Sequence, residues 1–130
     1  MPGSLARAGS MLAAAWFTLR GHEVSWPLEP SRYDLLVCRD ERVVRVQVKT
    51  TVSQVRGTWK VYLSTCRQGR LPYRADEIDE FFIIDGEFGC FRIPIGAVEG
   101  LQAIHLSAYA DYRVEGFDGA AIAPAGGVLG

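Results

Sequence analysis

The chain has 130 residues, of which 48% are hydrophobic and 22% charged, and its formal net charge is −1. This length favours one domain with one hydrophobic core, and the near-neutral charge excludes a strongly basic protein that binds nucleic acid through bulk charge. No segment reaches the ~18 consecutive apolar residues that a membrane span requires. Three cysteines without metal-ligand spacing indicate free thiols in a reducing cytoplasm.

The residue patterns predict one helix followed mainly by strands. Apolar residues recur at helical spacing over residues 5–20, and Gly21 is a natural helix end. Strands, recognised by alternation and by turn residues at their ends, are predicted over residues 22–26, 32–38, 43–50, 58–65, 81–84, 90–95 and 104–106. Residues 66–77 are predicted as a polar loop. One domain is expected over residues 1–115, with a loosely ordered tail over 116–130. This order predicts an α/β (α+β) fold on a mixed sheet.

Strand 43–50 carries the most informative pattern. Its residues alternate strictly, so that three valines point to one face while Arg45, Gln47 and Lys49 point to the other. A two-residue turn at Asp40-Glu41 pairs residues whose numbers sum to 81, which places Asp34 opposite Gln47. Lys49 lies on the same face, about 7 Å along the strand. The hairpin therefore predicts three polar groups converging at one point.

A carboxylate, an amide oxygen and a lysine suit metal-assisted cleavage of a phosphodiester. Mg²⁺, for which Mn²⁺ is a substitute, takes oxygen ligands, and Asp34, Gln47 and the backbone carbonyl of Val48 offer three. The ion polarises the phosphate and acidifies a water, and Lys49 orients that water and offsets developing charge. On spacing alone, a surface strand with scattered polar residues is the alternative interpretation.

A cation-rich segment follows the hairpin. No acid occurs from residue 52 to residue 75, and aromatic residues interleave the cations. This pattern favours a phosphate-facing surface, with a solvated loop as the alternative. The candidate nucleic-acid-binding residues are Arg56, Lys60, Arg67, Arg70, Tyr73 and Arg74.

The stretch from Gly21 to Thr51 resembles the core of the PD-(D/E)XK nuclease superfamily. It reads RGHEVSWPLEPSRYDLLV and then RVVRVQVKTT, with a Gln-x-Lys form in place of Glu-x-Lys. The branch with small homing endonucleases and Holliday-junction resolvase-like proteins shares a helix ending in glycine, a strand leading to a proline, and YDL before VQVKT. Downstream, YRADEIDEFFIID and FRIPI resemble later elements of that branch. The similarity spans residues 5–95.

This resemblance implies a restriction-endonuclease-like αβββαβ core with a central mixed sheet. It also implies Asp34, Gln47 and Lys49 as the catalytic and metal positions, a double-stranded or branched DNA partner, and a homodimer or higher homo-oligomer. One departure concerns the first helix, where the family usually carries a glutamate after a glycine. The matching pair here is Gly9-Ser10, and serine supplies no charged ligand.

Three functions remain open from the sequence. The leading hypothesis is a Mg²⁺-dependent DNA endonuclease of the homing or junction-resolving kind. A DNA-binding protein that kept the fold but lost cleavage is the second, motivated by Ser10. An interaction domain without nucleic acid is the third, motivated by the near-neutral charge.

Overall fold

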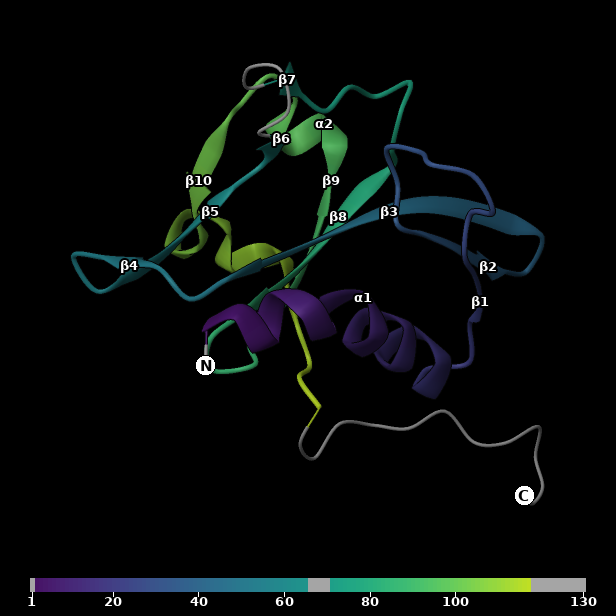
Figure 1. Ribbon diagram of the computed structural model, residues 1–130, viewed down its shortest axis with the longest axis horizontal. Helices are drawn as coiled ribbons and strands as arrows, with labels where there is room; N and C mark the ends of the chain where they lie inside the picture. The colour runs from purple at the N-terminus through teal and green to yellow at the C-terminus, as the bar shows by residue number, and fades with distance from the viewer. Residues whose placement is uncertain (1, 66–70, 118–130) are drawn as a thin grey trace.

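The computed structural model describes residues 2–65 and 71–117 (Figure 1). In chain order the helices and strands are α1 (Pro2–Leu19), β1 (Glu23–Ser25), β2 (Leu35–Arg39), β3 (Arg42–Thr51), β4 (Gln54–Val55), β5 (Thr58–Tyr62), β6 (Ser64–Thr65), β7 (Leu71–Pro72), β8 (Glu80–Asp85), β9 (Cys90–Pro94), α2 (Ile95–Val98), β10 (Ala103–His105), the 3₁₀ helix η1 (Leu106–Tyr112) and β11 (Arg113–Val114). Within these ranges no helix combines the length and apolarity needed to cross a membrane.

The predicted helix and the principal strands are confirmed, with shifted boundaries. β2 begins at Leu35, three residues later than predicted, because residues 30–34 form the loop that leads into it. The strand predicted over 58–65 is divided into β5 and β6. The short elements α2, β4, β7, η1 and β11 were not predicted, because they span too few residues to show a period. Most of the predicted tail, together with Cys66, Arg67 and Arg70, lies outside the described residues.

The central sheet has six strands in the order β1-β2-β3-β8-β9-β11. β3 and β8 run parallel, and the other neighbouring pairs described in this sheet are antiparallel. The mixed α/β class predicted from the sequence is therefore confirmed. Between β3 and β8, where the αβββαβ order places a helix, the described residues form short strands and turns.

One face of the sheet is covered by α1, which lies beneath it in Figure 1. Trp16 and Phe17 of the helix pack against Phe82 of β8, with ring centroids 5.0 and 5.2 Å apart. Val46 and Val48 of β3 belong to the same cluster. The valine face predicted for strand 43–50 is therefore the helix-facing side.

The opposite face is covered by β5, β10 and the two short helices. Phe81 and Ile83 of β8 belong to this second cluster, together with Val61 and Leu63. Because alternate residues of β8 enter different clusters, its continuous apolar run is buried on both faces, as predicted. Gln47 and Lys49 thus share their side of β3 with this second layer.

Gly9 allows α1 to approach β3 closely. A Cβ atom at this position would lie 2.9 Å from Cγ2 of Thr50, whereas one at Gly3 would meet nothing within 4 Å. We expect Gly9→Val to lower the free energy of unfolding by about 1–3 kcal/mol through overpacking. Gly3→Val, the same change in open space, should shift it by less than about 0.5 kcal/mol. Urea unfolding followed by circular dichroism measures both, and equal effects would contradict close packing at Gly9.

Candidate active site

The hairpin of β2 and β3 sets the position of the predicted site. Its Cα pairs have residue numbers that sum to 81. Asp40 and Glu41 form the turn with φ of 52° and 65°, the left-handed conformation that a type I′ turn requires. The Asp34 N–H donates to the Val46 carbonyl at 2.8 Å. The predicted register is confirmed over β2, and Asp34 lies directly before the first residue of that strand.

The edge of β3 next to Asp34 carries several oxygen atoms. β2 begins at Leu35, so the backbone of Val48 has no partner in that strand. Its N–H instead donates to Oδ2 of Asp34 at 3.0 Å. The Val48 carbonyl points to the same side as its N–H, and Nε2 of Gln47 lies 3.5 Å from the carbonyl oxygen. A carboxylate, an amide and a backbone carbonyl therefore gather at one point.

Lys49 lies on the same face as Gln47, where an aromatic ring places its ammonium group. Nζ of Lys49 is 5.1 Å from the Tyr73 ring centroid, and the guanidinium carbon of Arg32 is 4.1 Å from the same centroid. A cation over an aromatic face is attracted by the ring quadrupole. Tyr73 therefore contacts two cations, of which Lys49 acts on the Asp34 carboxylate.

The buried position of Tyr73 contradicts its predicted role as a nucleic-acid contact. The residue is only 7% exposed, and its ring packs edge-on against Phe81 at a centroid distance of 5.4 Å. Burial is the main cause that raises the pKa of its hydroxyl. The sequence prediction was wrong because an aromatic residue among cations reads equally as a stacking platform or as core.

The Asp34 carboxylate is partly desolvated. Burial raises its pKa above the ordinary value, while the Val48 N–H and the charge of Lys49 oppose that shift. A raised pKa means that the protein environment does not fully compensate the negative charge. The site therefore favours a further positive group beside Asp34.

The first helix borders the same site at Ser10. A hollow of about 390 Å³ is lined by Ser10, the loop of residues 26–31, Tyr33 and Asp34. The helix position that was predicted to lack the usual glutamate thus faces the Asp34 hollow. Its hydroxyl is neutral, so the carboxylates that line this hollow come from Glu29 and Asp34, and Asp34 accepts the hydrogen bond of the Val48 N–H.

The oxygens at this edge fit a hard divalent cation such as Mg²⁺ or Mn²⁺. Asp34 supplies charge, Val48 supplies a carbonyl, and rotation of the Gln47 amide exchanges its nitrogen for its oxygen. Within residues 2–65 and 71–117, no three His, Cys, Asp or Glu side chains come together as metal ligands. The donor set is therefore suitable in chemistry but low in charge.

The predicted cationic residues take different positions. Arg56 lies in the turn between β4 and β5 with φ of 53°, followed by Gly57 with φ of 80°, and is exposed. Lys60 lies on β5, and its Nζ is 5.0 Å from the Tyr62 ring centroid. Arg74 is exposed and forms an ion pair with Asp76 at 3.3 Å. Arg67 and Arg70 lie outside the described residues.

Acidic residues 77, 79 and 80 pair with arginines from segments distant in sequence. Glu77 contacts Arg32 at 3.2 Å, and Glu80 contacts Arg92 at 2.8 Å. Asp79 accepts two side-chain hydrogen bonds from Arg45, at 3.0 and 3.1 Å, and this holds its pKa below the usual value. Arg32, Arg45 and Arg92 are therefore held in ion pairs within the described part of the chain.

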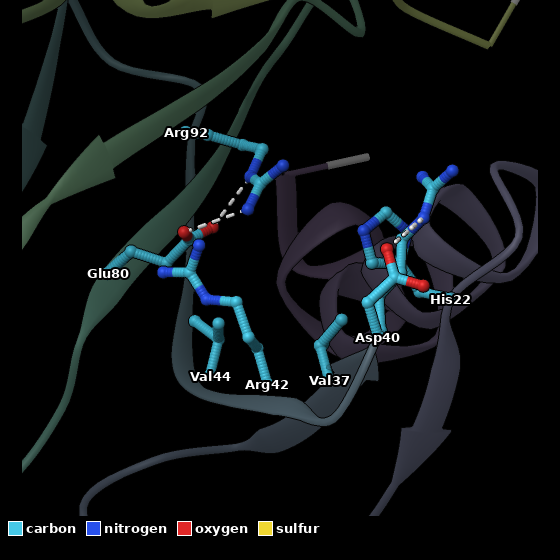
Figure 2. Close-up of a pocket in the computed structure, with 8 residues that line it drawn as sticks. His22, Val37, Asp40, Arg42, Val44, Glu80 and Arg92 are labelled. Atoms are coloured by element: carbon cyan, nitrogen blue, oxygen red, sulfur yellow. Dashed lines mark hydrogen bonds and ion pairs between the residues drawn. The ribbon is translucent and has the colours of Figure 1, made fainter.

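A second hollow, of about 290 Å³, lies at the other end of β3. Figure 2 shows Arg92 turned toward Glu80 and Arg42 beside them, with His22 and Asp40 on the opposite rim. Two dashed contacts mark carboxylates that already pair with arginines, Arg92–Glu80 and Arg39–Asp40. Two of the three arginines that line this hollow thus pair with its two carboxylates, so much of its charge cancels internally.

Sequence reasoning missed Arg32 and Ser64 as neighbours of the site. Arg32 reaches the carbonyls of Leu71 and Pro72, 39 and 40 residues away, at 3.4 and 3.5 Å. Ser64 is buried in the second layer. No local pattern marks such residues, because their partners come from distant segments.

Three comparisons with known proteins bear on the family and the fold of the chain. A model of the PD-(D/E)XK endonuclease family matches residues 5–113. The chain is 39% identical over 84 residues to Protein 5.3 of Escherichia phage T7, a match that covers 62% of this chain and 70% of the phage protein. Its fold is similar to that of a bacterial homing endonuclease, I-Ssp6803I, with a TM-score of 0.66 and 23% identity over 88% of this chain and 78% of that one.

The family match spans most of the chain and includes the hairpin that brings Asp34, Gln47 and Lys49 together. The structural similarity independently supports the restriction-endonuclease-like fold. We conclude that the chain belongs to the PD-(D/E)XK endonuclease family.

Proposed function

We propose that this protein is a metal-dependent endonuclease that hydrolyses phosphodiester bonds in DNA, with Asp34, Gln47 and Lys49 at its catalytic centre. The observation that carries the proposal is the gathering of Asp34, the Gln47 amide and the Val48 carbonyl at the edge of β3, with Lys49 on the same face. Membership of an endonuclease family supports it.

Asp34, the Gln47 amide oxygen and the Val48 carbonyl would hold the metal ion. A divalent cation supplies charge that polarises the phosphate and acidifies the attacking water. Asp34 contributes the negative charge that binding requires, and its incomplete compensation favours that binding. Lys49, held over the Tyr73 ring, orients the water and offsets charge developing on the phosphate oxygens.

A second candidate function is DNA binding without cleavage. Ser10 motivates it, because this residue borders the Asp34 hollow without supplying a carboxylate. In its fuller form the proposal includes a homing or junction-resolving role. It also includes a two-fold assembly in which two sites act on the two DNA strands. The fold similarity to a homing endonuclease favours the first of these roles.

We expect Asp34→Ala and Lys49→Ala each to reduce cleavage of plasmid and branched DNA in Mg²⁺ or Mn²⁺ by about 10²–10⁴-fold, because each removes a group that acts in the transition state. Gel-based initial rates measure this loss. Asp40→Asn, which changes an acid whose side chain is 90% exposed in the hairpin turn, should cleave normally. Full activity in both site variants would reject the assignment. If the wild-type protein binds DNA but does not cleave it, the second function, DNA binding without cleavage, is selected.

The raised pKa of Asp34 has a predicted effect on stability. A carboxyl group whose folded-state pKa is raised stabilises the fold when neutral, and this contribution is lost as the pH rises through the folded pKa. Asp34→Asn keeps an acceptor for the Val48 N–H without the charge. In EDTA at pH 7 we therefore expect this variant to unfold at higher urea concentration than wild type. The difference should vanish near pH 3 or below, where Asp34 is protonated.

The same urea titrations on Asp40→Asn provide the control, since that side chain is exposed and should show no such pH-dependent gain. A wild-type chain more stable than Asp34→Asn at pH 7 would contradict the desolvated carboxylate. If the difference in unfolding midpoint between Asp34→Asn and wild type stays constant as the pH is lowered, the charge of Asp34 is not the cause of that difference.

Restoring a carboxylate at the first helix should strengthen metal binding. We expect Ser10→Glu to lower the Mg²⁺ concentration for half-maximal cleavage by about tenfold, because a second carboxylate within ~4 Å of a cation contributes a few kcal/mol. Titration of the cleavage rate with Mg²⁺ measures this shift. Ser10→Gln has nearly the same shape without the charge and should not reproduce it. Equal effects of the two variants would place residue 10 away from the cation.

A further inference from the structure

A separate hollow of about 390 Å³ lies between the C-terminal half of β3 and the strand β5. Lys49 lines one side of it and Lys60 another, and these are the two lysines of the chain. No carboxylate is among the described residues that line it. The hollow is therefore suited to an anion and unsuited to a cation.

The walls of this hollow also carry hydroxyl groups. Ser64 is 3% exposed, and its Oγ is buried without a hydrogen-bond partner among the described residues. An unpaired buried hydroxyl is unfavourable, so its retention indicates a partner that the described residues do not supply. Thr50 and Ser53 also line the hollow and are less buried.

A hydrogen-bonded clamp holds Lys60 in position beside β3. Oγ1 of Thr51 donates to the Lys60 carbonyl at 2.5 Å and accepts from the Ser53 N–H at 3.1 Å. The Lys60 N–H donates to the Ser53 carbonyl at 3.0 Å. Since these bonds tie β5 to the end of β3, the backbone of Lys60 is placed before any ligand binds. A preorganised cation loses less entropy on binding.

We propose that this hollow binds a backbone phosphate of the DNA substrate next to the phosphate that is cleaved, with Lys60 and Ser64 as positioning residues. The inference rests on the proposed function, because Lys49 lines the hollow and also belongs to the catalytic centre. Lys60 supplies charge to the phosphate, and the Ser64 hydroxyl donates a hydrogen bond to one of its oxygens. Arg56 is exposed at the tip of the hairpin whose second strand, β5, carries Lys60.

Binding without cleavage tests the subsite. In EDTA, with a short fluorescent duplex as the probe, we expect Lys60→Ala to weaken binding about five- to tenfold. The slope of log affinity against log salt concentration should become less steep by about one, which is the contribution of one phosphate contact. Ser64→Ala should weaken binding severalfold yet leave stability to urea unchanged or increased, because it removes an unsatisfied buried hydroxyl. If Ser64 had a purely structural role, Ser64→Ala would change the affinity for the duplex and the stability to urea in the same direction.

Two remote substitutions serve as controls. Arg42→Ala removes the same charge at the opposite end of β3, and Ser25→Ala removes an exposed hydroxyl from β1. Both should bind the duplex as wild type does, apart from a small salt-sensitive change for Arg42→Ala. Equal losses in Lys60→Ala and Arg42→Ala would show a diffuse electrostatic effect and overturn the subsite.

A duplex series with single methylphosphonate substitutions locates the contact. Wild type should lose affinity when the phosphate next to the scissile one is neutralised, and Lys60→Ala should be insensitive to that substitution. In cleavage assays Lys60→Ala should raise KM with little change in kcat.

The outcomes separate the subsite from the proposed function. If wild type binds the duplex with this dependence on Lys60 and on the neighbouring phosphate but does not cleave it, the endonuclease is rejected and the subsite is kept. Wild-type affinity in Lys60→Ala and Ser64→Ala would reject the subsite alone, and absence of any binding by wild type would reject both.

Discussion

The antiparallel pairing of β2 with β3 is the constraint on which the site depends. The side-chain period of a strand is two, so a slip of one residue would turn Gln47 and Lys49 toward α1 and bury their polar groups in an apolar cluster. The left-handed turn at Asp40 and Glu41 and the buried valines of β3 both oppose such a slip. Because Asp34 follows the same register, one hairpin determines both the fold of the sheet edge and the position of the carboxylate.

The charges divide into a framework set and a site set. Arg45 forms a bidentate pair with Asp79, and Arg92 forms one with Glu80. These pairs join β3, β8 and β9. This pairing explains how a chain of net charge −1 can still present lysines to a phosphate. The arginines neutralise the acidic cluster, and the lysines beside β3 line a hollow whose described walls hold no acid.

The site carries features that weaken the fold locally. Asp34 is desolvated, as its raised pKa indicates, and the Ser64 hydroxyl is buried without a partner among the described residues. Each is unfavourable within the described structure, and the ion and the phosphate that we propose as ligands would supply the missing contacts. Tyr73 offsets part of this cost, because its buried ring holds Lys49 and Arg32 in place and packs against Phe81.

Local pattern was enough to predict the first helix, the alternation of β3, the doubly buried β8 and the hairpin register, because these depend on residues close in sequence. Only the tertiary structure decided that Tyr73 is core rather than surface, since its partners Arg32 and Lys49 are 41 and 24 residues away. The same holds for the hollow between β3 and β5. Cation–aromatic contacts and buried hydroxyls have no sequence period, so which segments meet there depends on how the two layers pack.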